Sequence, residues 1–138
     1  MTLKLAGGGL LAAAVVFGAG WFIGASGTAT LEQDRREAVA RAEFAEARAH
    51  ILEGRVQLFQ SNFGQANKAF EAARVLVTSS QTRLRQVGDA GRAGQLEVAI
   101  AQLREAQRLS LALDSRAQAA SDEALHVIDA VSSTAPGR

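Results

Sequence analysis

Apolar residues and glycine fill every position from Leu5 to Ile23, and no charged residue or proline interrupts them. A helix rises about 1.5 Å per residue, so this run would span roughly 28 Å, close to the hydrocarbon thickness of a bilayer. We predict a membrane anchor over residues 1–27 rather than a cleaved signal peptide, whose apolar core is usually shorter. The more polar remainder predicts a helical bundle over residues 28–133 and a short tail over 134–138.

The predicted anchor carries small residues at helical spacing along one side, namely Gly9, Ala13, Gly20 and Gly24. Small residues let membrane helices approach closely, so we expect integral membrane proteins to pack against this face within the lipid bilayer. Trp21 and Phe22 lie near the end of the run, where aromatic rings favour the membrane interface. We place the protein in a bacterial inner (cytoplasmic) membrane as a single-pass protein, with its helical domain on the periplasmic side.

Beyond the anchor, apolar positions recur every three or four residues, the period of an amphipathic helix. A first helix is predicted to begin at Thr30, with Gln33 completing a capping box. Its predicted buried face is the row Ala42, Ala45, Ala49, Leu52, Val56 and Phe59, which continues to Phe63 in the turn. Ile51 and Leu58 lie beside this row and would widen it.

Two more helices follow the same pattern. After a turn at residues 61–64, the second predicted helix buries the row Ala66, Phe70, Ala73, Val77, Ser80, Leu84 and Val87. Residues 88–94 are predicted to form a glycine-rich loop. An unbroken apolar row then predicts one long helix over residues 95–131, although a cap at Ser115 or Ser121 would divide it. The fold predicted is therefore all-α: a transmembrane helix followed by an antiparallel three-helix bundle of coiled-coil type, with four helices as the alternative.

The second predicted helix and its turn also carry a family pattern. Gly54 occupies a small-residue position and Phe63 an aromatic turn position, and the small–large–small signature is Ala66, Phe70 and Ala73. In this register residues 47–80 resemble a single tetratricopeptide repeat, although His50 and Thr78 depart from the usual residues. The resemblance implies that these residues pack a helix–turn–helix unit and that the unit binds proteins.

Charge and composition exclude several function classes. The chain has 15 basic and 14 acidic residues, interleaved along the helices, so we expect no nucleic-acid partner. The absence of cysteine excludes thiol chemistry. Glu123 and His126 have the spacing of a di-iron motif, but the second motif that such sites need is missing, so we expect both histidines at surface or boundary positions. We therefore expect no catalysis, no cofactor, no metal and no small-molecule substrate.

Together these features predict a non-catalytic, single-span accessory subunit that packs in and stabilises a larger membrane protein complex. Energy-transducing assemblies, respiratory or photosynthetic, offer the analogy. The alternative is a membrane-anchored, tetratricopeptide-like adaptor that binds a soluble protein. A self-assembling coiled-coil stalk is a further possibility.

Overall fold

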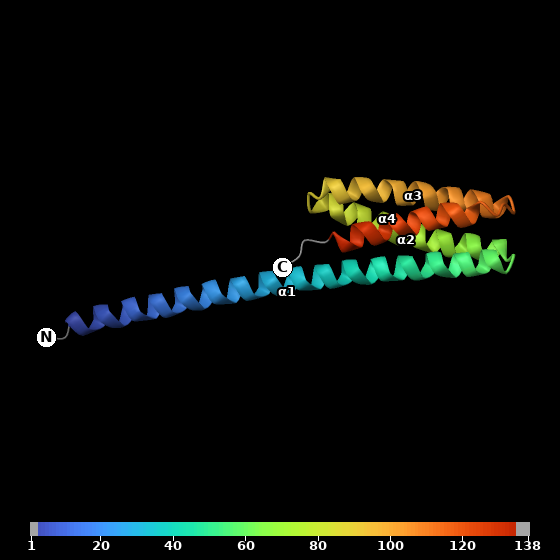
Figure 1. Cartoon of the computed structure of the whole chain (residues 1–138). Helices are drawn as coiled ribbons and strands as arrows, with labels where there is room; N and C mark the ends of the chain where they lie inside the picture. The colour runs from blue at the N-terminus through green and yellow to red at the C-terminus, as the bar shows by residue number, and fades with distance from the viewer. Residues whose placement is uncertain (1–2, 135–138) are drawn as a thin grey trace. The chain divides into compact units, whose positions relative to one another are not determined.

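The computed structural model describes the backbone of residues 3–134 and the side chains of residues 31–134. These residues form helices and turns without strands, which confirms the predicted all-α bundle (Figure 1). The chain divides into two compact units, Met1–Ala38 and Val39–Arg138. The helices are α1 (Leu3–Phe59), α2 (Phe63–Gln86), α3 (Ala90–Leu111) and α4 (Ala117–Ser133).

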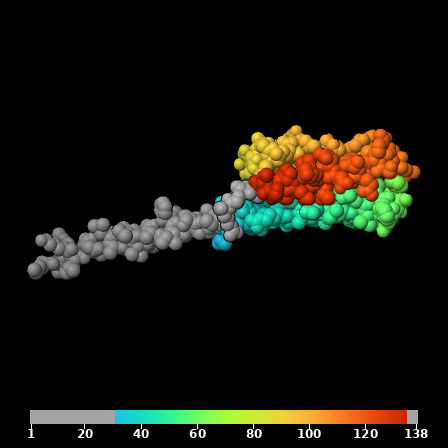
Figure 2. All heavy atoms as spheres, in the orientation of Figure 1, coloured from blue at the N-terminus to red at the C-terminus, as the bar shows by residue number. Residues whose placement is uncertain are grey.

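Within the second unit, α1 and α4 run antiparallel. Arg48 of α1 pairs with Asp129 of α4 at 3.1 Å, and one heptad later Arg55 pairs with Asp122 at 2.7 Å. The residue number rises along α1 while it falls along α4, as an antiparallel pair requires. In Figure 2, α4 lies between α1 and α3 on the face in view.

Polar contacts also connect α2 to both of its neighbours in the chain. Glu43 of α1 accepts a hydrogen bond from the hydroxyl of Ser80 at 2.9 Å. The amide of Gln107, in the last turns of α3, donates to Glu71 of α2 at 2.6 Å and joins the two helices. The result is an up–down–up–down four-helix bundle with short connections, the simplest topology for sequentially adjacent helices.

The core of this bundle consists of one apolar face from each helix. Its largest fully buried apolar side chains are Phe70, Ile51, Leu96, Leu103, Ile128, Val77 and Val131. Alanines fill most of the remaining core positions, so the helices approach closely and the core is thin. The buried positions expected for the second helix are confirmed from Ala66 to Leu84, whereas Val87 is exposed because α2 ends at Gln86.

The prediction of three helices in the bundle is wrong, because a turn divides the long helix predicted over residues 95–131. Leu113 adopts a left-handed backbone conformation, with φ of 56°. Its amide donates to the Ser110 carbonyl at 3.1 Å, and the Asp114 amide donates to the Leu109 carbonyl at 2.9 Å. These bonds satisfy carbonyls at the end of α3 and stop the helix there.

The apolar row nevertheless keeps its phase across this turn. Ser110 before the turn and Ala117 after it are both fully buried, while Leu113 between them is 69% exposed. The unbroken spacing of the apolar row therefore comes from the buried faces of two antiparallel helices, α3 and α4, and not from one long helix. The four-helix alternative is the correct one, although neither Ser115 nor Ser121 caps α4; its N-cap residue is Arg116, which makes no side-chain capping bond.

Two predicted helix boundaries are also wrong. The backbone is helical on both sides of Thr30, because α1 is continuous and no proline removes a backbone donor there. The predicted loop at residues 88–94 is shorter, because Asp89 caps α3 by accepting a hydrogen bond from the Arg92 amide at 3.0 Å. This cap starts the helix at Ala90 and places Gly94 within it.

The buried face predicted for the first bundle helix is the wrong one. The buried residues of α1 are Phe44, Ala47, Ile51, Gly54 and Leu58. At 3.6 residues per turn, their face lies about 150° around the helix from the predicted row of Ala42, Ala45, Ala49, Leu52, Val56 and Phe59. The bundle buries the face that contains Gly54 and leaves the predicted row on its outside.

Helices α1 and α2 are in close contact at Gly54. A Cβ atom placed on Gly54 would lie 2.5 Å from Cε1 of Phe70, whose side chain is fully buried. The ring therefore packs directly on the backbone of α1. Glycine at this position allows the largest core side chain to fit between the two helices.

In the part of the chain whose side chains are described, no helix is sufficiently long and apolar to cross a membrane. The predicted anchor over residues 1–27 lies outside that part. The same holds for the residues assigned to membrane packing and to the membrane interface, namely Gly9, Ala13, Gly20, Gly24, Trp21 and Phe22.

Candidate protein-binding surface

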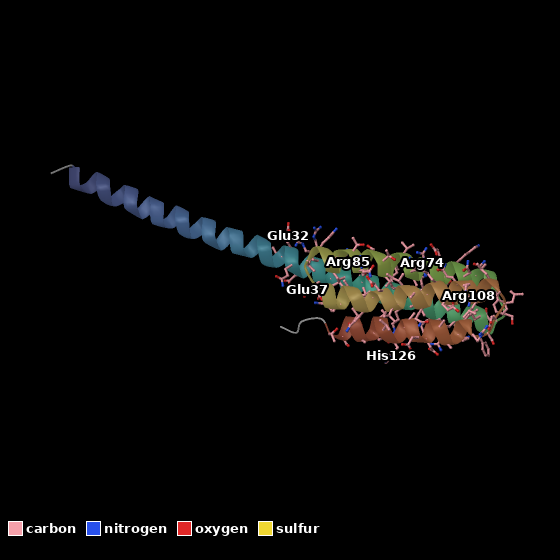
Figure 3. The ribbon with its side chains drawn as sticks, turned by 90° about the horizontal axis from the view of Figure 1, so that it is seen from above. Glu32, Glu37, Arg74, Arg85, Arg108 and His126 are labelled. Atoms are coloured by element: carbon pink, nitrogen blue, oxygen red, sulfur yellow. The ribbon has the colours of Figure 1, made fainter. Side chains whose placement is uncertain are left out.

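The histidines do not gather into a reactive site. His126 is exposed on the outer side of α4, as is Glu123 one turn earlier (Figure 3). His50 is half-buried and lies 3.4 Å from the carboxylate of Glu53, its neighbour on the same helix. Over residues 31–134, no three His, Asp or Glu side chains come close enough to hold a metal ion.

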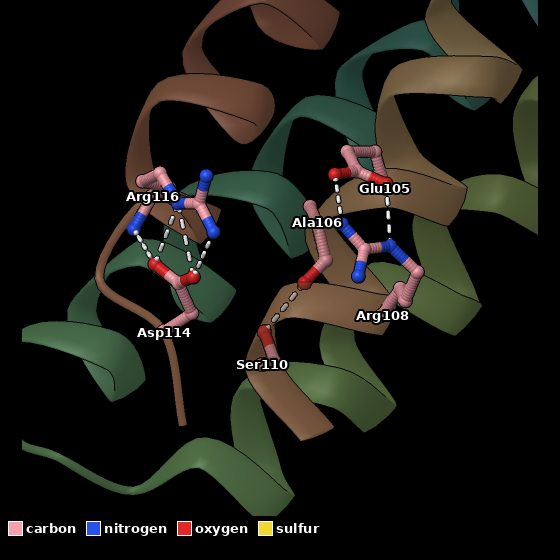
Figure 4. Close-up of polar contacts among 6 residues, drawn as sticks. All are labelled: Glu105, Ala106, Arg108, Ser110, Asp114 and Arg116. Carbon is pink, nitrogen blue, oxygen red and sulfur yellow. Dashed lines mark hydrogen bonds and ion pairs between the residues drawn. The ribbon is translucent and has the colours of Figure 1, made fainter. Parts of the chain in front are cut away.

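Several ion pairs on the charged surface join residues three or four positions apart on one helix. Glu105 accepts a hydrogen bond from Nε of Arg108 at 2.8 Å, and this contact lowers the pKa of the Glu105 carboxyl (Figure 4). Glu71 has a lowered pKa because Arg74, and next Gln107, donate to its carboxylate. Such pairs contribute little to stability in water and leave a solvated surface.

The α3–α4 turn holds the strongest of these local contacts. Nη2 of Arg116 lies 2.6 Å from the Asp114 carboxylate, and the Arg116 amide donates to the same group at 2.9 Å (Figure 4). These hydrogen bonds, the side-chain one foremost, lower the pKa of Asp114 to about 2. The contact fixes the conformation of the turn that places α4 beside α1.

Exposed apolar side chains gather at the end of the bundle where this turn lies. The α1–α2 and α3–α4 turns share that end, as the antiparallel pairing of Arg55 with Asp122 requires (Figure 1). We call its most exposed apolar residues the turn-end patch: Phe59 is 87% exposed, Leu111 71% and Leu113 69%. Exposed apolar groups that gather in this way are typical of surfaces that bind other proteins.

A shallow hollow of about 310 Å³ adjoins the patch between α1 and α4. Its lining residues are Leu52, Arg55, Val56, Phe59 and Gln118. Gln118 closes one side, because its amide donates to the Arg55 carbonyl at 3.2 Å while its oxygen accepts from the Arg55 side chain at 3.4 Å. The hollow thus has an apolar floor on α1 and a polar wall on α4.

A second apolar surface runs from the patch along the outside of α1. We call it the outer row: Ala42, Ala45, Ala49, Leu52, Val56 and Phe59, all exposed. Their spacing predicts that these residues lie in the bundle core, which is wrong. Spacing also places Leu113 in the apolar row of one long helix and Leu111 beside that row, so neither is predicted at the surface.

The residues assigned to helix–turn–helix packing lie together at the α1–α2 contact. Gly54, Ala66, Phe70 and Ala73 are buried, and Phe63, the first residue of α2, packs half-buried against the core. These residues shape the interior of the bundle. The surface available to a partner consists of the turn-end patch and the outer row.

The fold and this surface define the class: an antiparallel four-helix bundle with exposed apolar surfaces along one helix and at one end. The chain matches no protein-family model. No curated protein and no solved structure matches it either. The functional argument therefore depends on the residues themselves.

Proposed function

We propose that this protein is a non-catalytic, single-span accessory subunit that packs in and stabilises a larger membrane protein complex. The turn-end patch carries the proposal, because Leu111 and Leu113 expose apolar side chains beside the ion pair of Arg108 with Glu105. A docked protein would remove this apolar area from water, a gain of about 25 cal/mol for each Å² buried. The apolar run from Leu5 to Ile23 supports membrane attachment.

Affinity purification tests this function. The tagged full chain is extracted from native membranes in mild detergent, and proteins that co-elute in fixed ratio are identified by mass spectrometry. We expect integral membrane proteins with the unaltered chain and their loss with Leu113→Glu. Val98→Glu is the matched control, since Val98 is 48% exposed on α3, away from the patch.

Membrane attachment is tested separately by washing membranes with alkaline carbonate. The full chain should stay with the membranes, whereas a chain lacking residues 1–27 should be released. Release of the full chain would contradict the single-span assignment. Recovery of the full chain without fixed-ratio membrane partners would contradict the role as a complex subunit.

The hollow beside Phe59 favours a second candidate, a membrane-anchored, tetratricopeptide-like adaptor for a soluble protein. Its apolar floor and the Arg55–Gln118 wall offer both contact area and hydrogen-bonding groups to a peptide. The adaptor would be favoured over the accessory subunit if the purification recovered soluble proteins in variable ratio and if Phe59→Glu reduced their recovery.

A further inference from the structure

The outer row of α1 has the spacing of a coiled-coil seam. Its residues alternate three and four positions apart from Ala42 to Phe59, so they occupy successive a and d positions of a heptad repeat. Ala42, Ala49 and Val56 take a positions, while Ala45, Leu52 and Phe59 take d positions. The seam lies on the outside of the bundle, where Leu52 is 41% exposed and Val56 53%.

The residue types at the exposed end of this seam favour two parallel helices. A β-branched residue at a combined with leucine at d is the preference of parallel two-stranded coiled coils. Val56 and Leu52 supply this combination in adjacent positions. The alanines earlier in the seam would let two helices approach closely. At that distance, charged side chains on either side of the seam can reach those of the other helix.

The charges beside the seam identify the second helix. Arginine occupies the g positions at Arg41, Arg48 and Arg55, whereas glutamate occupies the e positions at Glu46 and Glu53. In a parallel pair, each g residue faces the e residue five positions later on the other helix. A second copy of α1 therefore supplies a glutamate opposite both Arg41 and Arg48. An antiparallel copy would bring arginine to arginine and glutamate to glutamate.

The fold leaves this arrangement accessible. The buried face of α1 points almost directly away from the seam, so a second helix can lie along it without displacing the core. Arg48 remains 54% exposed while it pairs with Asp129, so its guanidinium can contact a second carboxylate. The pairs with α4 also hold Arg48 and Arg55 along the seam edge, which reduces the entropy lost on association.

We propose that residues 42–59 of α1 form a parallel, in-register, two-stranded coiled coil with the same segment of a second copy of this chain. Arg41 pairs with the partner subunit's Glu46, and Arg48 pairs with the partner subunit's Glu53. This dimer goes beyond the proposed function and does not depend on it, because its contacts lie on α1 and share only Phe59 with the turn-end patch, whose other members, Leu111 and Leu113, carry that function.

Disulfide trapping tests the dimer and its direction, since the chain has no native cysteine. Ala45→Cys is compared with Ala101→Cys, which introduces the same group at an exposed position of α3. The full chain is oxidised in native membranes and analysed without reductant. We expect disulfide-linked dimer for Ala45→Cys and none for Ala101→Cys. Equal amounts of linked dimer for the two variants would overturn the proposal.

Charge reversal then tests the paired residues. In mild detergent the unaltered chain should have twice its 14.5 kDa mass by light scattering, corrected for bound detergent. Glu46→Arg alone should lose the dimer, because two arginines then face each other, and adding Arg41→Glu should restore it. If Ala45→Cys formed a disulfide only with Val56→Cys on the other chain, the helices would be antiparallel and the proposal would be overturned. A dimer that persists in Glu46→Arg would also overturn it. Membrane partners lost by Leu113→Glu but retained by Glu46→Arg would separate the two surfaces.

Discussion

The contact between Gly54 and Phe70 gives the most direct test of the bundle. Gly54→Ala should add a methyl group 2.5 Å from Cε1 of Phe70, and the ring has no exposed side toward which to move. Forcing extra volume into a packed core costs about 1–3 kcal/mol. Alanine in place of glycine returns about 1 kcal/mol of helix propensity. The net change should be a loss of stability between zero and about 2 kcal/mol.

Gly94→Ala isolates the steric part of this effect. Gly94 is also helical, but no heavy atom lies within 4 Å of the position its Cβ would take. This variant should gain about 1 kcal/mol from propensity alone. Thermal unfolding of the full chain in mild detergent, followed by helical circular dichroism, should therefore place Gly54→Ala below Gly94→Ala by about 4 °C or more.

A double variant distinguishes the contact from a general intolerance of change at Gly54. Phe70→Leu removes Cε1 and Cζ, which would lie 2.5 and 2.9 Å from the new methyl group. Leucine keeps a δ carbon, and Cδ1 of Phe70 lies 2.8 Å from the same position, so in that background Gly54→Ala should be less destabilising than in the unaltered protein. If Gly54→Ala stabilised the unaltered protein as much as Gly94→Ala does, the close approach of α1 and α2 would be refuted.

Three further predictions concern polar contacts and turns, each read from thermal midpoints. Glu43→Ala should cost about 1–3 kcal/mol because it leaves the buried Ser80 hydroxyl without its acceptor, and Glu43→Gln should cost less. Leu113→Gly should stabilise by up to about 1 kcal/mol by relieving a left-handed backbone, whereas Leu111→Gly, in the helix, should destabilise. Ionised Asp114 stabilises the fold above its ordinary pKa of 3.8, and this contribution is lost as the pH falls to about 2. The midpoint difference between the unaltered chain and Asp114→Asn should shrink over that window; a constant difference would contradict the lowered pKa.

Helix content and most core positions could be predicted from the sequence because they depend on local spacing. The row from Ala66 to Leu84 is buried as expected. The α3–α4 turn could not be predicted this way, since it depends on a left-handed Leu113, a conformation that leucine rarely adopts. The even spacing of the apolar row across the turn gave no signal of a break.

The face of α1 that enters the core could not be predicted from the sequence, because it depends on contacts with the other helices. Both faces of this helix have apolar residues three and four apart, so spacing alone could not rank them. Phe44, Ile51 and Leu58 can bury more area than alanines, and the backbone of Gly54 between them receives the Phe70 ring. Apolar volume does not rank the two faces either, because the outer row also carries Leu52, Val56 and Phe59.

The misassigned row is therefore the more informative face of α1. A bundle that needed only its intrachain core would tolerate polar residues at Leu52 and Val56, which lie on the outside. Instead the chain keeps a heptad spacing there, with arginine along one flank and glutamate along the other. Local pattern and global fold usually agree in natural proteins, and a disagreement points to a requirement outside the fold. On α1 that requirement is met by a second helix with the same charges in the same direction.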